Sequence, residues 1–339
     1  MKFQLILILI VGNVILGNAQ TILAPGEQPQ MTVDATGLVR LVYGDKTSIY
    51  YSTSTDKGKT FSKPVLIGQV AKMHLGMTRG PQLASSKDYS VVTAMDQAGN
   101  IHSFRLTHKT AKWEKIANVN DVDASAPEGL MSVAADENNN FYAVWLDLRE
   151  DRKNNIAFST LKGNSKWSKN KFAYKSAEDH VCECCKPSIA VNVNNVSIMF
   201  RNWLKGSRDL YLTTSSNNGQ TFTEAQKLGK GTWPLKGCPM DGGGLVIDSK
   251  NEIHTAWQRD GQIYYAKPGQ KEEKIGEGRH VGLNGNLATW ESGSDLYVKP
   301  LTGEKQKIGE GTALKVFEFS DKTILAVWEK DDQIVFKIL

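Results

Sequence analysis

The sequence predicts an all-β fold made of repeated units. No long segment places apolar residues at helical spacing, whereas short runs rich in β-branched and aromatic residues recur between turns of Gly, Asn, Asp and Lys. Seven of these runs end in aromatic or polar residues. They lie at residues 38–45, 89–96, 140–147, 195–202, 252–259, 286–292 and 323–330. A second run follows each of them after a short loop, at residues 48–54, 100–107, 155–162, 209–215, 262–268, 295–301 and 333–339.

Two further runs complete each unit and predict its architecture. A less regular strand precedes each pair, as at residues 187–192 and 243–248. A fourth strand follows six of the seven pairs, at residues 63–68, 114–119, 171–176, 225–229, 272–276 and 305–309. Four-stranded units repeated around an axis form a β-propeller, whose closed ring leaves no open sheet edge. We therefore expect a single domain, a seven-bladed β-propeller over residues 20–339.

The seventh unit lacks a fourth strand, because the chain ends on its third strand at residues 333–339. The segment 21–26 has no unit of its own and can supply the missing strand. The N-terminal strand is thus expected to complete the last blade and close the ring. This arrangement argues against an open sandwich or two smaller propellers, and a six-bladed ring is the remaining alternative.

The first residues have the features of an export signal. Lys2 precedes an apolar run over residues 5–11, and the small residues Gly17 and Ala19 follow it two positions apart. This pattern predicts a signal peptide over residues 1–19 and a secreted or periplasmic protein. The alternative is a membrane anchor, for which the run is short and interrupted by Asn13. No later segment has the length of a membrane span, and we expect a monomer.

The charge pattern excludes nucleic acid as an expected partner. The chain has 41 Lys and Arg residues against 36 Asp and Glu, a net charge of +5. The basic residues are spread along the sequence, whereas a nucleic-acid-binding surface requires them in a cluster.

Two turns carry a motif. Residues 54–61, STDKGKTF, place Ser54, Asp56, Gly58 and Phe61 in the pattern S-x-D-x-G-x-x-F. Residues 215–222, SSNNGQTF, repeat it with Ser215, Asn217, Gly219 and Phe222. The chain resembles the Asp-box (BNR) repeat propellers of the sialidase-like superfamily. The resemblance implies that these turns are structural and lie on the face opposite the binding site.

The resemblance does not carry over a catalytic set. Sialidases have an arginine triad, a Tyr–Glu pair, an Asp acid/base, six blades and an F/Y-R-I-P stretch near the N-terminus. The nearest stretch here, MTRGPQ at residues 77–82, does not match. A closer likeness is to exported bacterial propellers with CxCC in one blade and a GCPMDG-like motif in the next, a pattern that implies no particular activity.

The four cysteines lie in two neighbouring blades. Cys182, Cys184 and Cys185 precede blade four, and Cys238 precedes blade five. Aligning Ile189 with Leu245 places Cys182 and Cys238 at equivalent positions, so both are expected near the axis. In an oxidising compartment a disulfide between the two blades is favoured, either Cys182–Cys238 or a bridge from Cys238 to Cys184 or Cys185. The alternative is a site for copper or another soft metal, completed by Met240, His180 or His74.

Two long loops on the same face offer candidate ligand-binding and catalytic groups. Arginine binds carboxylates through two hydrogen bonds, tryptophan stacks on sugar rings, and carboxyl groups perform acid/base chemistry. The candidate catalytic residues are Asp147, Glu150, Asp241 and Glu128. The candidate ligand-binding residues are Arg149, Arg152, Arg201, Trp203, Arg208 and Asp209. The alternative is that the Asp–Arg pairs only brace their loops.

Three functions fit these observations. The first is an exported propeller that recognises a glycan or other small anionic ligand on the loop face and hydrolyses it. The second is a binding or adhesion propeller without catalysis. The third is a protein that uses its cysteine cluster for thiol or soft-metal chemistry. The architecture does not separate them, because propellers support many functions.

Overall fold

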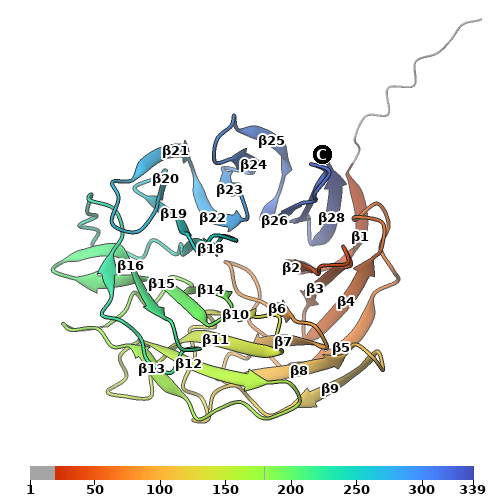
Figure 1. Ribbon diagram of the computed structural model, residues 1–339, viewed down its shortest axis with the longest axis horizontal. Coiled ribbons are helices and arrows are strands. Elements are labelled where there is room, and N and C mark those ends of the chain that lie inside the picture. Colours follow the sequence, from red (N-terminus) through yellow and green to blue (C-terminus); the bar gives the residue numbers. More distant parts are fainter. Residues whose placement is uncertain (1–19, 179) are drawn as a thin grey trace, which may run out of the picture.

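The computed structural model describes residues 20–178 and 180–339 and consists of seven four-stranded antiparallel sheets arranged in a ring (Figure 1). This confirms the predicted all-β, seven-bladed propeller, and the six-bladed alternative is wrong. The predicted signal peptide, residues 1–19, lies outside the described residues. Within the described part of the chain, no helix has the length and apolar character needed to cross a membrane.

Each blade has four strands that run from the axis outwards. The innermost strands are β2 (Glu27–Val33), β6 (Gln82–Ser85), β10 (Met131–Ala135), β14 (Ser188–Asn192), β18 (Gly243–Ile247), β22 (Arg279–Asn284) and β26 (Thr312–Glu318). The second strands are β3 (Val39–Asp45), β7 (Tyr89–Met95), β11 (Asn140–Asp147), β15 (Asn195–Leu204), β19 (Ile253–Arg259), β23 (Leu287–Ser292) and β27 (Ile324–Lys330). The third strands are β4 (Ser48–Ser54), β8 (Ile101–Thr107), β12 (Asn155–Lys162), β16 (Ser207–Ser215), β20 (Gln262–Ala266), β24 (Asp295–Pro300) and β28 (Gln333–Ile338). The outer strands are β5 (Val65–Gln69), β9 (Lys112–Ile116), β13 (Lys171–Tyr174), β17 (Gln226–Lys227), β21 (Glu273–Glu277), β25 (Gln306–Glu310) and β1 (Thr21–Pro25).

The ring is closed by its N-terminal strand, as predicted. β1 pairs antiparallel with β28, with Thr21 opposite Phe336 and Pro25 opposite Gln333. The last sheet therefore has the order β1-β28-β27-β26 and joins the first described strand to the last three strands; β1 and β28 lie side by side in Figure 1. Every blade is thereby flanked by two others.

The core lies between the blades. The second strands are nearly continuous apolar runs, and in β11 every residue after Asn140 is buried. A sheet that is covered on both faces favours continuous apolar runs. A sheet with one face exposed to solvent instead alternates apolar and polar residues. One cluster, for example, packs Val144 and Phe158 of the third blade against Ile198 and Phe200 of the fourth.

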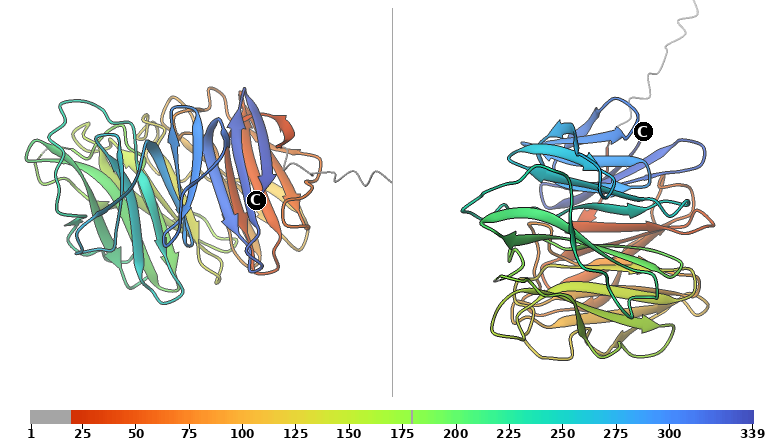
Figure 2. Two further views of the ribbon diagram at one scale, coloured as in Figure 1. Left: turned by 90° about the horizontal axis from the view of Figure 1, so that it is seen from above. Right: turned by 60° about the vertical axis from the view of Figure 1, so that its left-hand side comes forward.

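The strand directions define two faces, visible at the top and bottom of the ring in the left view of Figure 2. Because successive strands are antiparallel, the beginnings of the innermost strands and the turns between second and third strands share one face. We call this the loop face. On it, the connections 70–81, 117–130, 175–187 and 228–242 are long, whereas Gly26, Gly278 and Gly311 alone make the other three.

The two Asp-box turns lie on the opposite face, between third and fourth strands. In the first turn, Ser54 Oγ donates to Asp56 Oδ1 at 2.7 Å and accepts from Gly58 N at 2.8 Å. Asn217 takes the place of the aspartate in the second turn, where Ser215 Oγ donates to its Oδ1 at 2.8 Å. These closed networks agree with a structural role.

One expected loop is instead part of two strands. Residues 200–209 form an extended hairpin, since β15 continues to Leu204 and β16 begins at Ser207. The pairs Asn202–Asp209 and Trp203–Arg208 are directly opposite each other across the hairpin. Their side chains are therefore fixed by sheet register, and the expectation of a long loop here is wrong.

Candidate functional site

A cavity of about 280 Å³ lies on the ring axis, lined by the innermost strands of all seven blades. Its wall is closely packed at β18, where Gly243 and Gly244 begin the strand. A Cβ atom on Gly244 would lie 2.4 Å from Leu283 N of the next blade, so only glycine allows this approach. The volume is at the small end of the range typical of ligand sites.

Two lysines from different blades line this cavity. Lys186 precedes β14, and its Nζ donates to Gln82 Oε1 at 2.6 Å. Burial, together with the charge of Lys315, lowers the pKa of Lys186 to about 7. Burial also lowers the pKa of Lys315, and the nearby Glu291 only partly opposes this shift. Within residues 20–178 and 180–339, neither ammonium group has a carboxylate at ion-pair distance.

A histidine and two carboxyl groups form another part of the lining. His280 donates from its backbone N–H to Asp241 Oδ2 at 2.9 Å and from Nδ1 to Glu291 Oε2 at 2.8 Å. Arg279 Nε donates to His280 Nε2, which fixes Nδ1 as the protonated ring nitrogen. Burial raises the pKa of Asp241. Burial favours a neutral Glu291 as well, but hydrogen bonds from His280 and Thr312 lower its pKa.

These backbone contacts repeat around the ring. Gln28, His280 and Ala313 each have a positive φ, of 54°, 55° and 56°. Each lies in a bulge near the start of its innermost strand, where the pairing with the second strand shifts. Each N–H group donates to a carboxylate of the blade that precedes its own around the ring. The acceptors are Glu329 for Gln28, Asp241 for His280 and Glu291 for Ala313, all within 2.9 Å. The three carboxylates therefore also connect neighbouring blades.

The cysteine cluster borders the cavity through Lys186, which follows Cys185 directly. Cys184 and Cys238 form the disulfide between blades four and five, with Cα atoms 6.2 Å apart. Cys182 is therefore not the bridging residue, and the pairing with Cys184, left open by the sequence, is the one formed. Cys182 and Cys185 are free and buried, with their sulfur atoms 3.4 Å apart.

Two arginines pack against the free cysteines. Arg208 Nη1 lies 2.9 Å from Cys182 Sγ and also pairs with Glu183 at 3.1 Å. A hydrogen bond with Cys185, and then the charges of Arg208 and Arg201, lower the pKa of Cys182 to about 7, although burial opposes this. Burial raises the pKa of Cys185. Of the two thiols, Cys182 is therefore the one that loses its proton more readily.

The disulfide limits the donors that the cysteine cluster offers to a soft metal. The disulfide withdraws Cys184 and Cys238 as ligands, and only the Cys182 and Cys185 sulfurs remain. His74 Nε2 is 3.0 Å from the carbonyl oxygen of Pro127, and His180 Nε2 is 3.1 Å from Glu183 Oε2. Thiolates and thioethers are the donors that soft metals prefer, and in the disulfide form two of the four cysteine sulfurs remain as donors of this kind.

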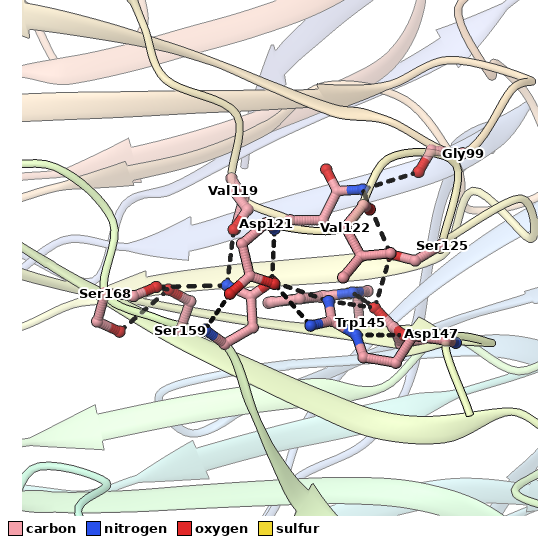
Figure 3. A network of polar contacts seen from close by, with 12 residues as sticks. Gly99, Val119, Asp121, Val122, Ser125, Trp145, Asp147, Ser159 and Ser168 are labelled. Atoms are coloured by element: carbon pink, nitrogen blue, oxygen red, sulfur yellow. Dashed lines mark hydrogen bonds and ion pairs between the residues drawn. The ribbon is translucent and has the colours of Figure 1, made fainter.

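The candidates in the third blade brace their loop. Asp147 is fully buried and accepts hydrogen bonds from Ser125, Trp145 and Arg149 (Figure 3). Arg149 also pairs with Asp121 at 2.6 Å. This network ties the second and third blades together, as the structural alternative for Asp147 and Arg149 expected.

The remaining candidates are dispersed. Glu150 pairs with Lys175 on the surface, and Arg152 is exposed. Glu128 Oε1 accepts from Asn154, and Asp209 accepts from Thr232 and the backbone of Trp233. The Arg208 guanidinium lies over the Trp203 ring, with its Cζ atom 4.4 Å from the ring centroid. Of the sequence candidates, only Asp241 lines the axial cavity.

Sequence reasoning missed four polar residues of the cavity: Lys186, Lys315, His280 and Glu291. One signal was present for Lys186, because it directly follows the cysteine motif at the beginning of an innermost strand. Glu291 and Glu329 each follow a tryptophan near the end of the second strand of their blade. The repeated Trp-Glu dipeptide marks equivalent positions in the two blades.

Comparisons with known proteins identify the fold alone. No protein-family model and no curated protein matches this sequence. Among solved structures, virginiamycin B lyase from Staphylococcus aureus is similar, with a TM-score of 0.56, 11% identity, and coverage of 94% of this chain and 98% of the lyase. An α-L-arabinanase from Penicillium chrysogenum complexed with arabinobiose has a TM-score of 0.54 and 11% identity over 94% of this chain and 97% of the other. A Hadza microbial sialidase has a TM-score of 0.53 and 13% identity over 93% of this chain and 65% of its own length.

Proposed function

We propose that this protein is an exported Asp-box propeller that binds a small anionic ligand, such as a carboxylated sugar, in its axial cavity. The observation that supports this most directly is the pair Lys186 and Lys315. Both ammonium groups line the same cavity, burial lowers the pKa of each, and the charge of Lys315 lowers the pKa of Lys186 further. A buried cation is unfavourable, and a bound anion stabilises the charged form of both lysines.

The rest of the lining suits a polar ligand of modest size. Gln28, Gln82 and Ser188 offer amide and hydroxyl groups, and Leu314 and Val316 offer apolar surface. Pockets of this mixed kind orient a sugar through a few polar contacts while its carbon face packs on aliphatic side chains. At about 280 Å³ the cavity fits a single ring better than a chain. The arabinobiose held by a propeller of similar fold is consistent with a sugar ligand.

Binding of an acidic sugar tests the proposal. Isothermal titration of the purified protein at pH 6 with glucuronate is expected to show saturable binding, whereas glucose, its neutral counterpart, binds at least tenfold more weakly. Lys186→Gln and Lys315→Gln should each weaken glucuronate binding by about tenfold or more, the usual worth of one charged contact. Lys250→Gln, an exposed lysine on the opposite face, is the matched control and should change nothing.

Equal affinity for glucuronate and glucose would contradict the proposal. So would glucuronate binding that survives both cavity substitutions unchanged. N-acetylneuraminate and inorganic phosphate in the same titration separate a sugar carboxylate from a general anion site.

Hydrolysis of the bound sugar is a second candidate, supported by Asp241 and Glu291. Both line the cavity and both contact His280, yet the pKa of Asp241 is raised and that of Glu291 is lowered. Carboxyl groups whose pKa values are pushed apart can serve as acid and base in glycoside cleavage. Turnover of 4-nitrophenyl glucuronide that is lost in Asp241→Asn, with glucuronate binding retained, would support catalysis. If the wild type binds glucuronate but does not turn over the glucuronide, the protein is a binding propeller without catalysis.

A further inference from the structure

The cysteine cluster contains a free cysteine, Cys182, next to a disulfide that it does not belong to. Cys182 Sγ lies 3.7 Å from Cys184 Sγ, one atom of the Cys184–Cys238 bridge. This separation is close to van der Waals contact between sulfur atoms, so little movement precedes attack. Cys182 is buried, whereas Cys238 is exposed on the loop face.

The surroundings of Cys182 favour its thiolate. Arg208 of β16 donates to the sulfur from Nη1 at 2.9 Å. The charge of Arg201 of β15 also lowers the pKa of Cys182. Glu183, the residue after Cys182, is itself bound to Arg208 at 3.1 Å. Thiolates are the nucleophiles of disulfide exchange, and nearby arginines are a usual means of forming them.

We propose that Cys182, Cys184 and Cys238 form a thiol–disulfide exchange site, in which Cys182 attacks Cys184 and releases Cys238 as a reactive surface thiol. The Cys182 thiolate forms a new S–S bond with Cys184, the Cys184–Cys238 bond breaks, and its electron pair leaves on Cys238 sulfur, which takes a proton from water. One disulfide is exchanged for another, so no external oxidant or reductant is needed.

The choice of Cys182 over Cys185 follows from chemistry and position. Cys185 Sγ is also near Cys184 Sγ, at 4.0 Å, but burial keeps Cys185 protonated. A bridge between adjacent residues also requires a strained ring, whereas one intervening residue leaves the Cα atoms at an ordinary disulfide separation. Cys185 is therefore a neighbour in contact with the nucleophile and not the nucleophile itself.

Exchange has a structural consequence that is independent of the proposed ligand. The Cys184–Cys238 bridge is the covalent link between blades four and five, and Asp241 of the cavity lies three residues beyond Cys238. The Cys182–Cys184 form removes this link and frees the segment that carries Cys238. The exposed thiol then becomes the point at which an exported disulfide or other soft electrophile reacts.

Trapping with a thiol reagent tests the proposal on the unreduced, full-length mature protein. The folded protein is incubated with N-ethylmaleimide, quenched in acid, digested and mapped by mass spectrometry. The expected result is time-dependent labelling of Cys238, together with a peptide that contains a Cys182–Cys184 disulfide. In Cys182→Ser, Cys238 should stay unlabelled, whereas in the matched variant Cys185→Ser its labelling should persist.

The pH dependence separates exchange in the folded state from exchange after unfolding. Labelling of Cys238 should rise with pH to a midpoint near 7, the pKa of Cys182, and then level off. Arg208→Gln should move the midpoint toward the value of an ordinary thiol, about 8.5, and slow labelling at pH 7 by about tenfold. Arg208→Lys, which keeps the charge, should retain the lower midpoint.

Three outcomes would overturn the proposal. The first is an intact Cys184–Cys238 bridge with no labelling of Cys238 at pH 8. The second is equal labelling of Cys238 in the wild type and in Cys182→Ser. The third is a midpoint near 8.5 in the wild type, which would indicate exchange through an unfolded chain.

Discussion

The side chain of Arg201 donates a hydrogen bond from Nε to the backbone carbonyl oxygen of Asp241, 3.3 Å away. The guanidinium also donates to the carbonyl oxygens of Arg208 and Gln258, each at 2.8 Å. Arg201 is 1% exposed and thus joins the fourth blade to two segments of the fifth. Its donors are directed to the backbone, so it is not available to clamp a ligand carboxylate.

Replacing Arg201 is therefore expected to affect stability first. Arg201→Met leaves three buried carbonyl oxygens without this donor, and each such loss costs about 1 kcal/mol. The free energy of unfolding, measured by urea denaturation, should fall by about 3 kcal/mol. Arg152→Met is the matched control, because Arg152 is exposed, and it should change stability by less than about 0.5 kcal/mol. A stable Arg201→Met protein that has lost only ligand binding would contradict this assignment.

Replacing Asp147 is likewise expected to lower stability and to leave ligand binding unchanged. Asp147→Asn removes a fully buried charge that Arg149 pairs with at 2.8 Å and that Trp145 Nε1 donates to at 2.7 Å. Breaking a buried ion pair on one side costs roughly 3 kcal/mol. The melting temperature should fall, and glucuronate affinity at a temperature where the variant is folded should be unchanged. Asp151→Asn, in the exposed part of the same loop, is the control.

Replacing a glycine by alanine should cost more stability in an Asp-box turn than in an open turn. A Cβ atom at Gly219, where φ is +76°, would lie 2.4 Å from Phe158 Cζ of the preceding blade. Gly37 has a similar φ of +83° but nothing within 4 Å. Gly37→Ala should cost about 1 kcal/mol from the backbone alone. Gly219→Ala adds overpacking, for a total of about 3 kcal/mol in denaturant unfolding. Equal losses would mean that the turn does not pack as described.

The repeat and the closing strand could be predicted because both are properties of local pattern. A strand covered on both faces is a short continuous apolar run, and the second strands, such as residues 140–147, are visible without any knowledge of their neighbours. The missing fourth strand of the last unit was sufficient to assign β1 to it.

The cavity could not be predicted because its members are brought together only by closure of the ring. Lys186 and Lys315 are more than a hundred positions apart, and each resembles the many surface lysines of the chain. The sequence predicts ligand-facing Arg201 and Arg208 side chains only if residues 200–209 form a loop, whereas they form a hairpin. Its register directs both into contacts with backbone and sulfur instead. Side-chain direction depends on register, which composition alone does not define.

The charge of Lys186 should make stability depend on pH in a defined direction. Its pKa is about 7 in the folded protein, against 10.5 for an ordinary lysine. Between these values the unfolded chain carries a proton that the folded chain lacks, so the contribution of Lys186 to stability rises with pH across this window. Below pH 7 both states are protonated, and the full cost of burying the charge remains.

Lys186→Met removes this cost together with the proposed ligand contact. The variant should be more stable than the wild type at pH 6, and its advantage should shrink toward pH 9, by at most about 1.4 kcal/mol per pH unit. Because Lys315 is present in both proteins, the difference between their urea midpoints isolates Lys186. Lys250→Met, which removes an exposed lysine, should show no such trend. A variant that is less stable than the wild type at pH 6, or a difference that does not change with pH, would mean that Lys186 is not a buried, unpaired cation. The support for an anion in the cavity would then be lost.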